Sequence, residues 1–209
     1  MPQPHTLKIS EIFASVQGEG LRQGEATLFV RLAGCNLKCD FCDTKYAWKG
    51  GEDLDIEQVL NRLEQENKRF PADWVCLTGG EPLIQDVGEL SERLKEIGMK
   101  IQTETNATLY QDLSVDWYTI SPKPPNYFFQ PEYREKAREV KLVVSKELTY
   151  EVVLRLRNKF PEKTPILLQP ESNRKWSRKK GVTLLKKCTT KGLKNIRISV
   201  QLHKIYDLK

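Results

Sequence analysis

The chain has 209 residues, of which 39% are hydrophobic and 30% are charged, and its formal net charge at pH 7 is +6. This length and balance are typical of a soluble protein with one real core, so we predict a single domain over residues 1–209. Apolar runs such as W74-V-C-L77 have the length of strands, which excludes a membrane-spanning helix.

The start of the chain, M1-P-Q-P-H-T, lacks the apolar segment of a signal peptide. Five cysteines, three of them close together, favour a reducing compartment over a disulfide framework. We therefore expect a cytoplasmic protein whose clustered thiolates are free to bind metal. Cys76 lies in an apolar run and Cys188 ends a basic stretch, so neither is predicted to be a ligand.

Strand-like and helix-like segments alternate along the chain, which is the pattern of a parallel sheet with crossover helices. A strand over 27–33 ends at Gly34, and an apolar stripe at helical spacing follows over 56–68, with Asp55 as the expected N-cap. A second helix, over 90–97, ends at Gly98, a typical residue for a helix C-terminus. The other predicted elements are strands over 74–78, 99–104, 117–121, 140–144, 166–169 and 196–202, and a helix over 150–159.

The stretch from Arg174 to Lys191 is rich in lysine and arginine and has two interpretations. Together with the net charge, it is typical of a nucleic-acid-binding surface. The basic residues, however, stand in helical order with Leu184 and Leu185. We therefore favour the solvated face of a helix and expect no direct contact with nucleic acid.

Cys35, Cys39 and Cys42 are separated by three residues and then by two, a spacing that fits one loop wrapped around a metal. A structural zinc site needs four ligands and an electron-transfer 4Fe–4S cluster usually has four cysteines, so three thiolates indicate a cluster with one open iron. Zinc is the alternative, with Asp40, Asp43 or a water as its further ligand. An assay for iron and sulfide separates the two.

The Cys-x3-Cys-x2-Cys spacing, with Phe41 before the last cysteine, resembles the cluster motif of radical S-adenosylmethionine (SAM) enzymes. This resemblance implies that the methionine moiety of SAM binds the open iron. It also implies an α/β fold, a partial (open) β/α barrel, because about six predicted βα units are too few for a complete barrel of eight. Chemistry in such barrels takes place at the carboxyl ends of the strands.

Four polar segments begin where predicted strands end, and each also has a purely structural interpretation. Thr78-Gly-Gly-Glu-Pro82 resembles the superfamily motif that binds the amino group of SAM, although paired glycines and a proline also make turns. Glu104-Thr-Asn106 either places a carboxylate beside a cationic ligand or forms a capped turn. Ser121-Pro-Lys123 and Gln169-Pro170 either line the same mouth or simply end their strands.

A narrower family fits almost the whole chain. Its motifs follow one another in order from Phe13 to the last residues, and the whole set resembles the 7-carboxy-7-deazaguanine synthases. The segments that carry this resemblance are F13-A-S-V-Q-G-E-G20, Arg31, C39-D-F-C-D-T44, Thr78-Gly-Gly-Glu-Pro82, Glu104-Thr-Asn106, Ser121-Pro-Lys123, Gln169-Pro170 and Q201-L-H-K-I-Y206. The match is less close in E171-S-N-R174.

The resemblance implies a pterin substrate, 6-carboxy-5,6,7,8-tetrahydropterin, and as cofactors a 4Fe–4S cluster on the three cysteines, SAM and Mg²⁺. Thr44 matches the family's magnesium ligand, in keeping with the preference of Mg²⁺ for oxygen. The residues implied to contact SAM are Phe41, Cys42, Asp43, Gly80, Glu81, Glu104, Ser121, Pro122, Lys123, Gln169, Pro170, Glu171 and Ser172. Those implied to contact the substrate are Val16, Gln17, Gly18, Glu19, Arg31, Thr78 and Lys209.

The implied reaction starts when an electron from the reduced cluster cleaves SAM, and the resulting 5'-deoxyadenosyl radical takes a hydrogen atom from the pterin. Ring contraction and loss of ammonia then give 7-carboxy-7-deazaguanine, a deazapurine of queuosine biosynthesis and so of tRNA modification. The family further implies a reductase or flavodoxin-type electron donor and a homodimer.

Two rival interpretations stay open. One is a radical SAM enzyme that activates a partner protein; such an enzyme has no need of Q17-G-E-G20 and Arg31 to recognise a pterin. The other is a zinc-stabilised nucleic-acid-binding module built on the basic stretch, which predicts bound zinc, no sulfide and salt-sensitive affinity for RNA.

Overall fold

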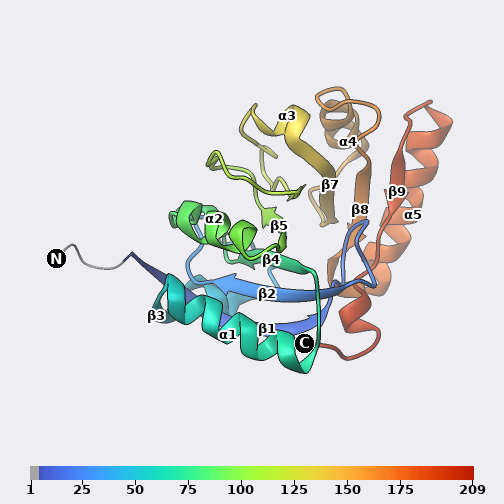
Figure 1. The fold of residues 1–209 in the computed structure, drawn as a ribbon. Helices are drawn as coiled ribbons and strands as arrows, with labels where there is room; N and C mark the ends of the chain where they lie inside the picture. The colour runs from blue at the N-terminus through green and yellow to red at the C-terminus, as the bar shows by residue number, and fades with distance from the viewer. Residues whose placement is uncertain (1–4) are drawn as a thin grey trace. The chain divides into compact units, whose positions relative to one another are not determined.

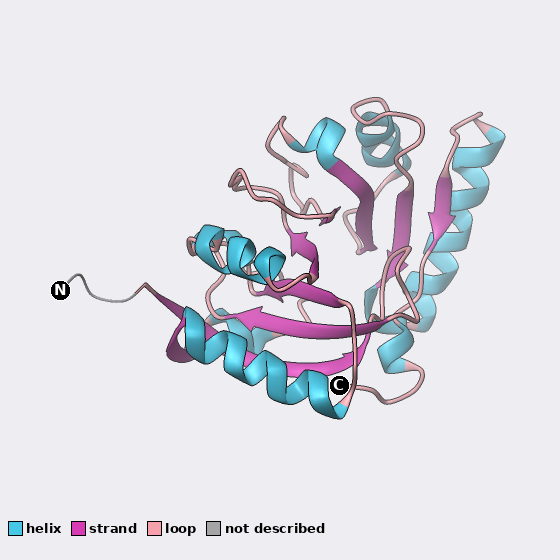
Figure 2. Cartoon of the chain, in the orientation of Figure 1, coloured by secondary structure: helices cyan, strands magenta, loops and turns pink. Residues whose placement is uncertain are grey.

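The computed structural model describes residues 5–209, in which helices and strands alternate (Figures 1 and 2). Most of M1-P-Q-P-H-T, on which the prediction about a signal peptide depends, lies outside the described residues. The chain divides into two compact units, and the prediction of a single domain stays a prediction. Unit 1 comprises the described residues up to Val16, Glu25–Thr105 and Leu109–Trp117; unit 2 comprises Gln17–Gly24, Asn106–Thr108 and Tyr118–Lys209.

Unit 1 is built on a mixed sheet with the strand order β3-β1-β2-β4-β5. These strands are β1 (Thr6–Val16), β2 (Ala26–Leu32), β3 (Glu52–Asp55), β4 (Trp74–Gly79) and β5 (Lys100–Thr105). β2, β4 and β5 are parallel, whereas β1 is antiparallel to β2 and to β3. Neither β1 nor β3 was predicted from the sequence. A register shift between Ile9 and Glu11 interrupts the apolar alternation of β1, and β3 has only four residues.

Two α-helices of unit 1 pack on this sheet, α1 (Ile56–Arg69) along β1 and α2 (Gly88–Glu96) along β5 (Figure 1). The predicted N-cap of α1 is confirmed, because Asp55 and Gln58 exchange side-chain and backbone hydrogen bonds as a capping box. Gly98 follows α2 with a φ of 83°, the left-handed conformation expected after a helix. Two 3₁₀-helices complete the unit, η1 (Lys45–Trp48) and η2 (Pro82–Ile84).

Unit 2 contains four parallel strands in chain order: β6 (Trp117–Ile120), β7 (Ala137–Val144), β8 (Ile166–Pro170) and β9 (Ile196–Ile198). The first residue of β6, Trp117, is counted with unit 1. Its helices are α3 (Tyr133–Lys136), α4 (Tyr150–Arg157), α5 (Lys175–Thr190), η3 (Glu171–Asn173) and η4 (Leu202–Lys204). α5 packs along β7, β8 and β9 (Figure 1). The core of the unit includes Leu142, Val144 and Leu168, which are fully buried.

One predicted element of unit 2 is wrong at its end. The strand expected over 196–202 stops at Ile198, residues 199–201 belong to no helix or strand, and η4 begins at Leu202. The Leu202 N–H donates to the Gly18 carbonyl at 2.8 Å, so this part of the chain satisfies its backbone away from a strand ladder. The predicted helix in the basic stretch is confirmed as α5, in which Leu184 and Cys188 are buried.

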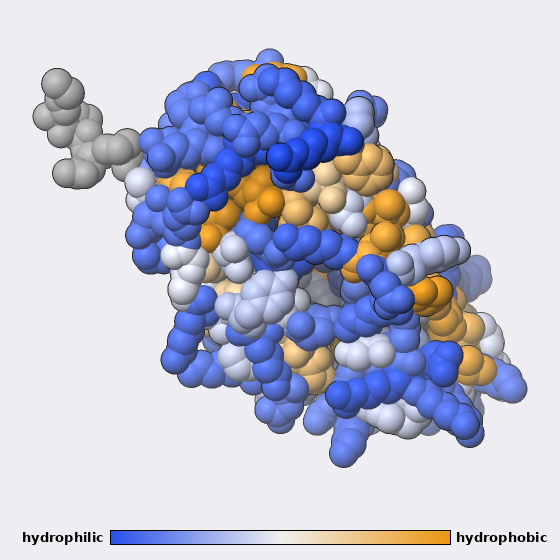
Figure 3. Space-filling model, turned by 90° about the horizontal axis from the view of Figure 1, so that it is seen from below, coloured by the Kyte–Doolittle hydropathy of each residue, from blue (hydrophilic) through white to orange (hydrophobic). Residues whose placement is uncertain are grey.

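The predicted α/β class is confirmed, since parallel strands alternate with helices in both units. In the part of the chain that the structure describes, β3 pairs only with β1 and β9 only with β8, so the strands do not close into a complete barrel. Hydrophilic residues predominate on the face drawn in Figure 3, in keeping with the high content of charged residues. No helix within residues 5–209 is both long enough and apolar enough to cross a bilayer.

Candidate active site

The three predicted cluster ligands lie on the loop of unit 1 that joins β2 to η1, here called the cysteine loop (residues 33–44). Gly34, with a φ of 96°, turns the chain out of β2, and its N–H donates to the Ala47 carbonyl at 2.8 Å. Cys35, Cys39 and Cys42 are half-buried and form no disulfide. The Cys42 N–H donates to the Cys39 carbonyl at 3.1 Å, so the last two cysteines share one turn.

The donor chemistry of this loop fits an iron–sulfur cluster. Burial raises the pKa of the Cys35 thiol, a backbone hydrogen bond at Leu37 opposes this, and the charges of Glu81, Cys39 and Cys42 raise it further. The thiols are therefore close enough to influence one another. A bound metal reverses this effect because coordination deprotonates the thiol. Three accessible soft donors on one loop suit iron and sulfide.

The segment after β4 lies directly against the cysteine loop. The Glu81 N–H donates to the Gly34 carbonyl at 2.9 Å. A Cβ on Gly80 would stand 2.1 Å from the Gly34 carbonyl oxygen and 2.8 Å from Cys35 Cβ. Glycine at this position is thus required by a close backbone approach, in addition to any role in a turn.

The side chain of Glu81 is fully buried. It accepts hydrogen bonds from the Leu83 N–H at 3.1 Å and from Thr105 Oγ1 at 2.6 Å, so it caps η2 and fixes the segment after β4 to β5. Glu104 on β5 is half-buried, and its Oε1 lies 3.5 Å from Gln102 Nε2. Of these two predicted SAM contacts, Glu81 therefore has an evident structural role.

A row of polar side chains crosses unit 1 near the carboxyl ends of β2 and β4. Arg31 is paired in register with Glu11 on one side and with Thr78 on the other. Arg31 Nε and the Tyr46 hydroxyl both donate to Glu11 Oε1, each at 2.7 Å. Burial and the bond to Glu11 raise the pKa of Tyr46 to about 12, so at neutral pH this hydroxyl stays a donor.

A buried apolar cluster lies next to this row on the sheet. It consists of Phe13, Phe29 and Cys76, each two positions from a member of the row on the same strand. The two phenylalanine rings stack at 4.9 Å, and the Arg31 guanidinium lies 5.8 Å from the Phe13 centroid. Among the described residues Arg31 makes one side-chain hydrogen bond, through Nε to Glu11. Its two Nη groups are therefore available to a ligand, and the apolar surroundings strengthen its charge interactions.

In unit 2, two buried side chains bind the carboxylate of Glu19. Lys141 Nζ contacts one carboxylate oxygen, and Gln201 Nε2 donates to the other at 2.8 Å. Lys141 is 6% exposed and Gln201 is 4% exposed. Lys141 was not among the predicted site residues, although a single lysine within the apolar run V140-K-L-V-V144 indicates a paired, buried cation.

The rest of this loop of unit 2 is fixed to β7. Glu139, which is fully buried, accepts hydrogen bonds from Thr119 Oγ1 and from the Leu21 N–H, both at 2.6 Å. Gly20 has a φ of 76°, and a Cβ there would stand 2.3 Å from Glu139 Oε1. Glycine suits position 20 for two reasons, because it adopts a positive φ without strain and because it has no Cβ to collide with Glu139.

Two further predicted segments follow the carboxyl ends of β6 and β8. Ser121 Oγ donates to the Lys141 carbonyl at 2.8 Å, and Lys123 Nζ donates to the Ser121 carbonyl at 2.7 Å. Gln169 and Glu171 are buried, whereas Lys209 at the end of the chain is exposed.

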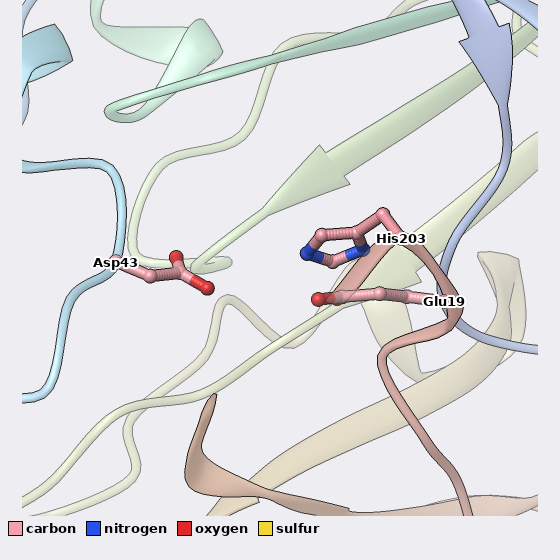
Figure 4. A group of neighbouring side chains, drawn as sticks. All are labelled: Glu19, Asp43 and His203. Carbon is pink, nitrogen blue, oxygen red and sulfur yellow. The ribbon is translucent and has the colours of Figure 1, made fainter. Parts of the chain in front are cut away.

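His203 lies beside Glu19 in unit 2, and each offers a ligand atom within 4.8 Å of the other (Figure 4). Asp43, also labelled in Figure 4, comes from the cysteine loop of unit 1. A Cβ on Gly18 would stand 2.3 Å from His203 Nδ1, which makes the histidine a packing partner of this loop.

The predicted site residues therefore fall into two sets. Unit 1 brings together the cysteine loop, Gly80, Glu81, Arg31 and Thr78. Unit 2 holds the loop from Gln17 to Glu19 and the segments after β6 and β8. That both sets open onto one mouth stays a prediction.

Comparison with known proteins gives one consistent result. Residues 30–180 match the model of the radical SAM superfamily. A 7-carboxy-7-deazaguanine synthase from Aquifex aeolicus (strain VF5) is 35% identical, and the match covers 97% of this chain and 94% of that protein. The synthase of the same name from Rickettsia prowazekii (strain Madrid E) is 30% identical over 97% of this chain and 89% of its own length.

Solved structures agree with this result. The crystal structure of QueE from Escherichia coli has a TM-score of 0.78 and 28% identity, and the match covers 95% of each chain. Streptococcus suis SuiB bound to S-adenosylmethionine has a TM-score of 0.57 and 17% identity over 80% of this chain and 48% of that one, a likeness of fold alone.

Proposed function

We infer the activity of this chain from its family, because the chain belongs to the radical SAM superfamily and, within it, to the 7-carboxy-7-deazaguanine synthases. It converts 6-carboxy-5,6,7,8-tetrahydropterin to 7-carboxy-7-deazaguanine with release of ammonia, a step towards the deazapurine of queuosine. The observation that carries this conclusion is the similarity to a synthase over 97% of the chain. The glycine segment packed against a loop with three cysteines that form no disulfide supports it.

The superfamily implies a 4Fe–4S cluster and SAM, and in our proposal Cys35, Cys39 and Cys42 hold the cluster. When bound, the cluster and SAM together supply one-electron chemistry that removes a hydrogen atom from a substrate carbon. Gly80 leaves its backbone open to the amino group of SAM, while the buried Glu81 keeps that backbone in place. The other SAM contacts in this proposal are Phe41, Asp43, Glu104, Ser121, Pro122, Lys123, Gln169, Pro170, Glu171 and Ser172.

For the substrate, we propose that Arg31 binds the carboxylate. The bond from its Nε to Glu11 orients the guanidinium and leaves both Nη groups for a two-pronged contact, which supports this role. The apolar cluster behind Arg31 limits access of water to the ion pair. Thr78, the neighbour of Arg31 in register, adds a hydroxyl. The planar edge of the pterin is recognised by Val16, Gln17, Gly18 and Glu19, with Lys209 closing over the ligand.

Mg²⁺ at Thr44 is also part of the proposal. Thr44 Oγ1 lies 3.1 Å from Asp43 Oδ1, and two neighbouring oxygens on one loop suit a cation that prefers oxygen ligands and keeps several waters. A reductase or flavodoxin-type electron donor, a homodimer and a cytoplasmic location are carried over from the family as further parts of the proposal.

The test is turnover by anaerobically reconstituted protein with dithionite, SAM and the carboxypterin, with mass spectrometry of the product. Cys35→Ala, Cys39→Ala and Cys42→Ala should each abolish product. Cys188→Ala is the matched control: this thiol is buried in α5, so the variant should keep its activity.

Protein with a complete cluster that makes no deazaguanine acid would overturn the proposed function. Zinc in place of iron and sulfide would instead favour the nucleic-acid-binding module. A glycyl radical on a partner protein would favour the activating enzyme.

A further inference from the structure

The end of unit 2 is hydrogen-bonded to both ligand-binding segments that the proposed function assigns to that unit. We call residues 199–204 the connector. We propose that the connector couples the binding of SAM to the binding of the pterin, with Gln201 in the connector and its partner Asn173 in the SAM segment as the positioning residues. This inference rests on the proposed function and adds to it a thermodynamic link between cofactor and substrate.

On one side the connector holds the loop proposed to recognise the pterin. Gln201 Nε2 donates to Glu19 Oε1 at 2.8 Å, and the Leu202 N–H donates to the Gly18 carbonyl at 2.8 Å. Gln23 Nε2 bridges the Gly18 and Val200 carbonyls at 3.0 and 3.1 Å. A shift of this loop therefore requires a shift of the connector.

On its other side the connector holds the segment proposed to contact SAM. Asn173 Nδ2 donates to the Gln201 carbonyl at 3.0 Å, and the Gln201 N–H donates to Asn173 Oδ1 at 3.4 Å. Lys204 Nζ donates to Ser172 Oγ at 3.1 Å. Gln201 is thus shared: its backbone is bonded towards the SAM segment and its side chain towards the pterin loop.

The backbone of the SAM segment depends on these bonds. Ser172 and Asn173 have φ values of 46° and 52°, in the left-handed region that non-glycine residues seldom occupy. The paired amide bonds between Asn173 and Gln201 offset that cost. Arg174 Nη1 donates a hydrogen bond to Glu171 Oε1 at 2.7 Å, which fixes the side chain of Glu171, the residue before Ser172.

A shared ordered element gives cooperativity. A ligand that orders the SAM segment also orders the connector, so the pterin then binds to a loop whose ordering cost has been reduced, and the reverse holds equally. SAM and pterin should therefore each increase the affinity of the other by the same factor. Couplings of this kind are commonly about 5- to 150-fold.

The test measures the dissociation constant of SAM by anaerobic equilibrium dialysis, with and without saturating pterin, on protein of verified iron and sulfide content. Asn173→Gly removes the amide and keeps the left-handed conformation accessible. It should lower the coupling factor about tenfold, or to unity if the wild-type factor is smaller, as expected for one or two lost hydrogen bonds. Gln201→Met removes the bond to Glu19 and should act in the same direction.

Asn195→Gly is the matched control. Asn195 also has a left-handed φ, 54°, and its Nδ2 also donates to backbone carbonyls, those of Glu162 at 2.9 Å and Lys163 at 3.1 Å, but it precedes β9 and does not bond to the connector. This variant should keep the wild-type coupling factor. As an independent readout, SAM alone should slow amide hydrogen exchange in residues 17–24 of wild-type protein and not of Asn173→Gly.

Three results would overturn the inference. They are a wild-type enzyme that converts the pterin but whose affinity for SAM does not change when the pterin is bound, full coupling retained in both Asn173→Gly and Gln201→Met, or an equal loss of coupling in Asn195→Gly. A wild-type enzyme with a complete cluster that neither binds nor converts the pterin would overturn the proposed function itself, and the inference with it.

Discussion

At the residue scale, Gly80 shows how strongly backbone crowding constrains this molecule. Gly80→Ala would bring a Cβ to 2.1 Å from the Gly34 carbonyl oxygen, so the segment after β4 must move away from the cysteine loop. We expect a loss of about 1–3 kcal/mol in the free energy of unfolding, the usual range for overpacking. Iron and sulfide per reconstituted chain should fall as well. Urea unfolding and metal analysis measure the two effects.

Gly88→Ala is the control for this change. Gly88 begins α2, and its added Cβ would meet only the Asp86 side chain, at 3.1 Å. The Gly88→Ala protein should therefore bind a full complement of iron. A Gly80→Ala protein that also bound full iron would contradict the importance of the close approach.

Arg31 is the residue that we propose to bind the carboxylate of the substrate. Arg31→Lys keeps the charge but loses the planar two-pronged donor, so kcat/KM for the pterin should fall about tenfold or more through KM. The affinity for SAM should stay the same. Arg62→Lys, at an exposed ion pair with Glu52, is the control and should change neither parameter. Equal effects of the two substitutions would argue against a carboxylate contact at Arg31.

At the scale of elements, Asp116 fixes the start of β5. Its carboxylate accepts hydrogen bonds from Lys95 Nζ at 2.6 Å and from the Ile101 N–H at 2.7 Å. Burial opposes ionisation, but these bonds outweigh it and hold the pKa of Asp116 below its usual 3.8. The charge therefore stabilises the folded state above the unfolded pKa, and this stability is lost as the pH falls through the lower folded pKa.

Asp116→Asn should accordingly be less stable than wild type at pH 7, by about 1 kcal/mol. The difference should shrink as the pH falls below 3.8 and through the lower pKa of the folded state, where the wild-type carboxylate becomes protonated. Urea unfolding of cluster-free protein at pH 7, 5 and 3 measures this. Asp53→Asn, at an exposed ion pair with Lys8, should show little difference at any of these pH values. A gap for Asp116→Asn that does not change with pH would count against the charge as the cause.

At the scale of the whole molecule, each unit has fully buried apolar residues on elements outside the cysteine loop. Leu28 and Leu77 in unit 1, and Leu142 and Leu148 in unit 2, are 1% exposed or less. Removing iron with a chelator and an oxidant should therefore leave the far-ultraviolet circular dichroism unchanged. Amide hydrogen exchange in residues 33–44 should quicken about tenfold or more, because the loop loses its metal. Cooperative unfolding on iron removal would contradict this.

Features that depend on short spacing could be predicted without the structure. The cysteine motif, the capping of α1 by Asp55 and Gly98 after α2 are each encoded within a few residues, so pattern and local hydrogen bonding were enough to predict them. The order of motifs along the chain also identified the family, which similarity over nearly the full length then confirmed.

Contacts between residues far apart in the sequence could be identified only in the folded chain. β1 became evident through its antiparallel pairing with β2, which contains a register shift, and β3 through its pairing with β1. The end of the expected strand over 196–202 instead forms a backbone hydrogen bond to Gly18. The bonds from Lys141 and Gln201 to Glu19 span 122 and 182 positions of sequence. Helix and strand periods are properties of neighbouring residues, whereas burial of a charge and its compensation depend on which surfaces come together when the chain folds.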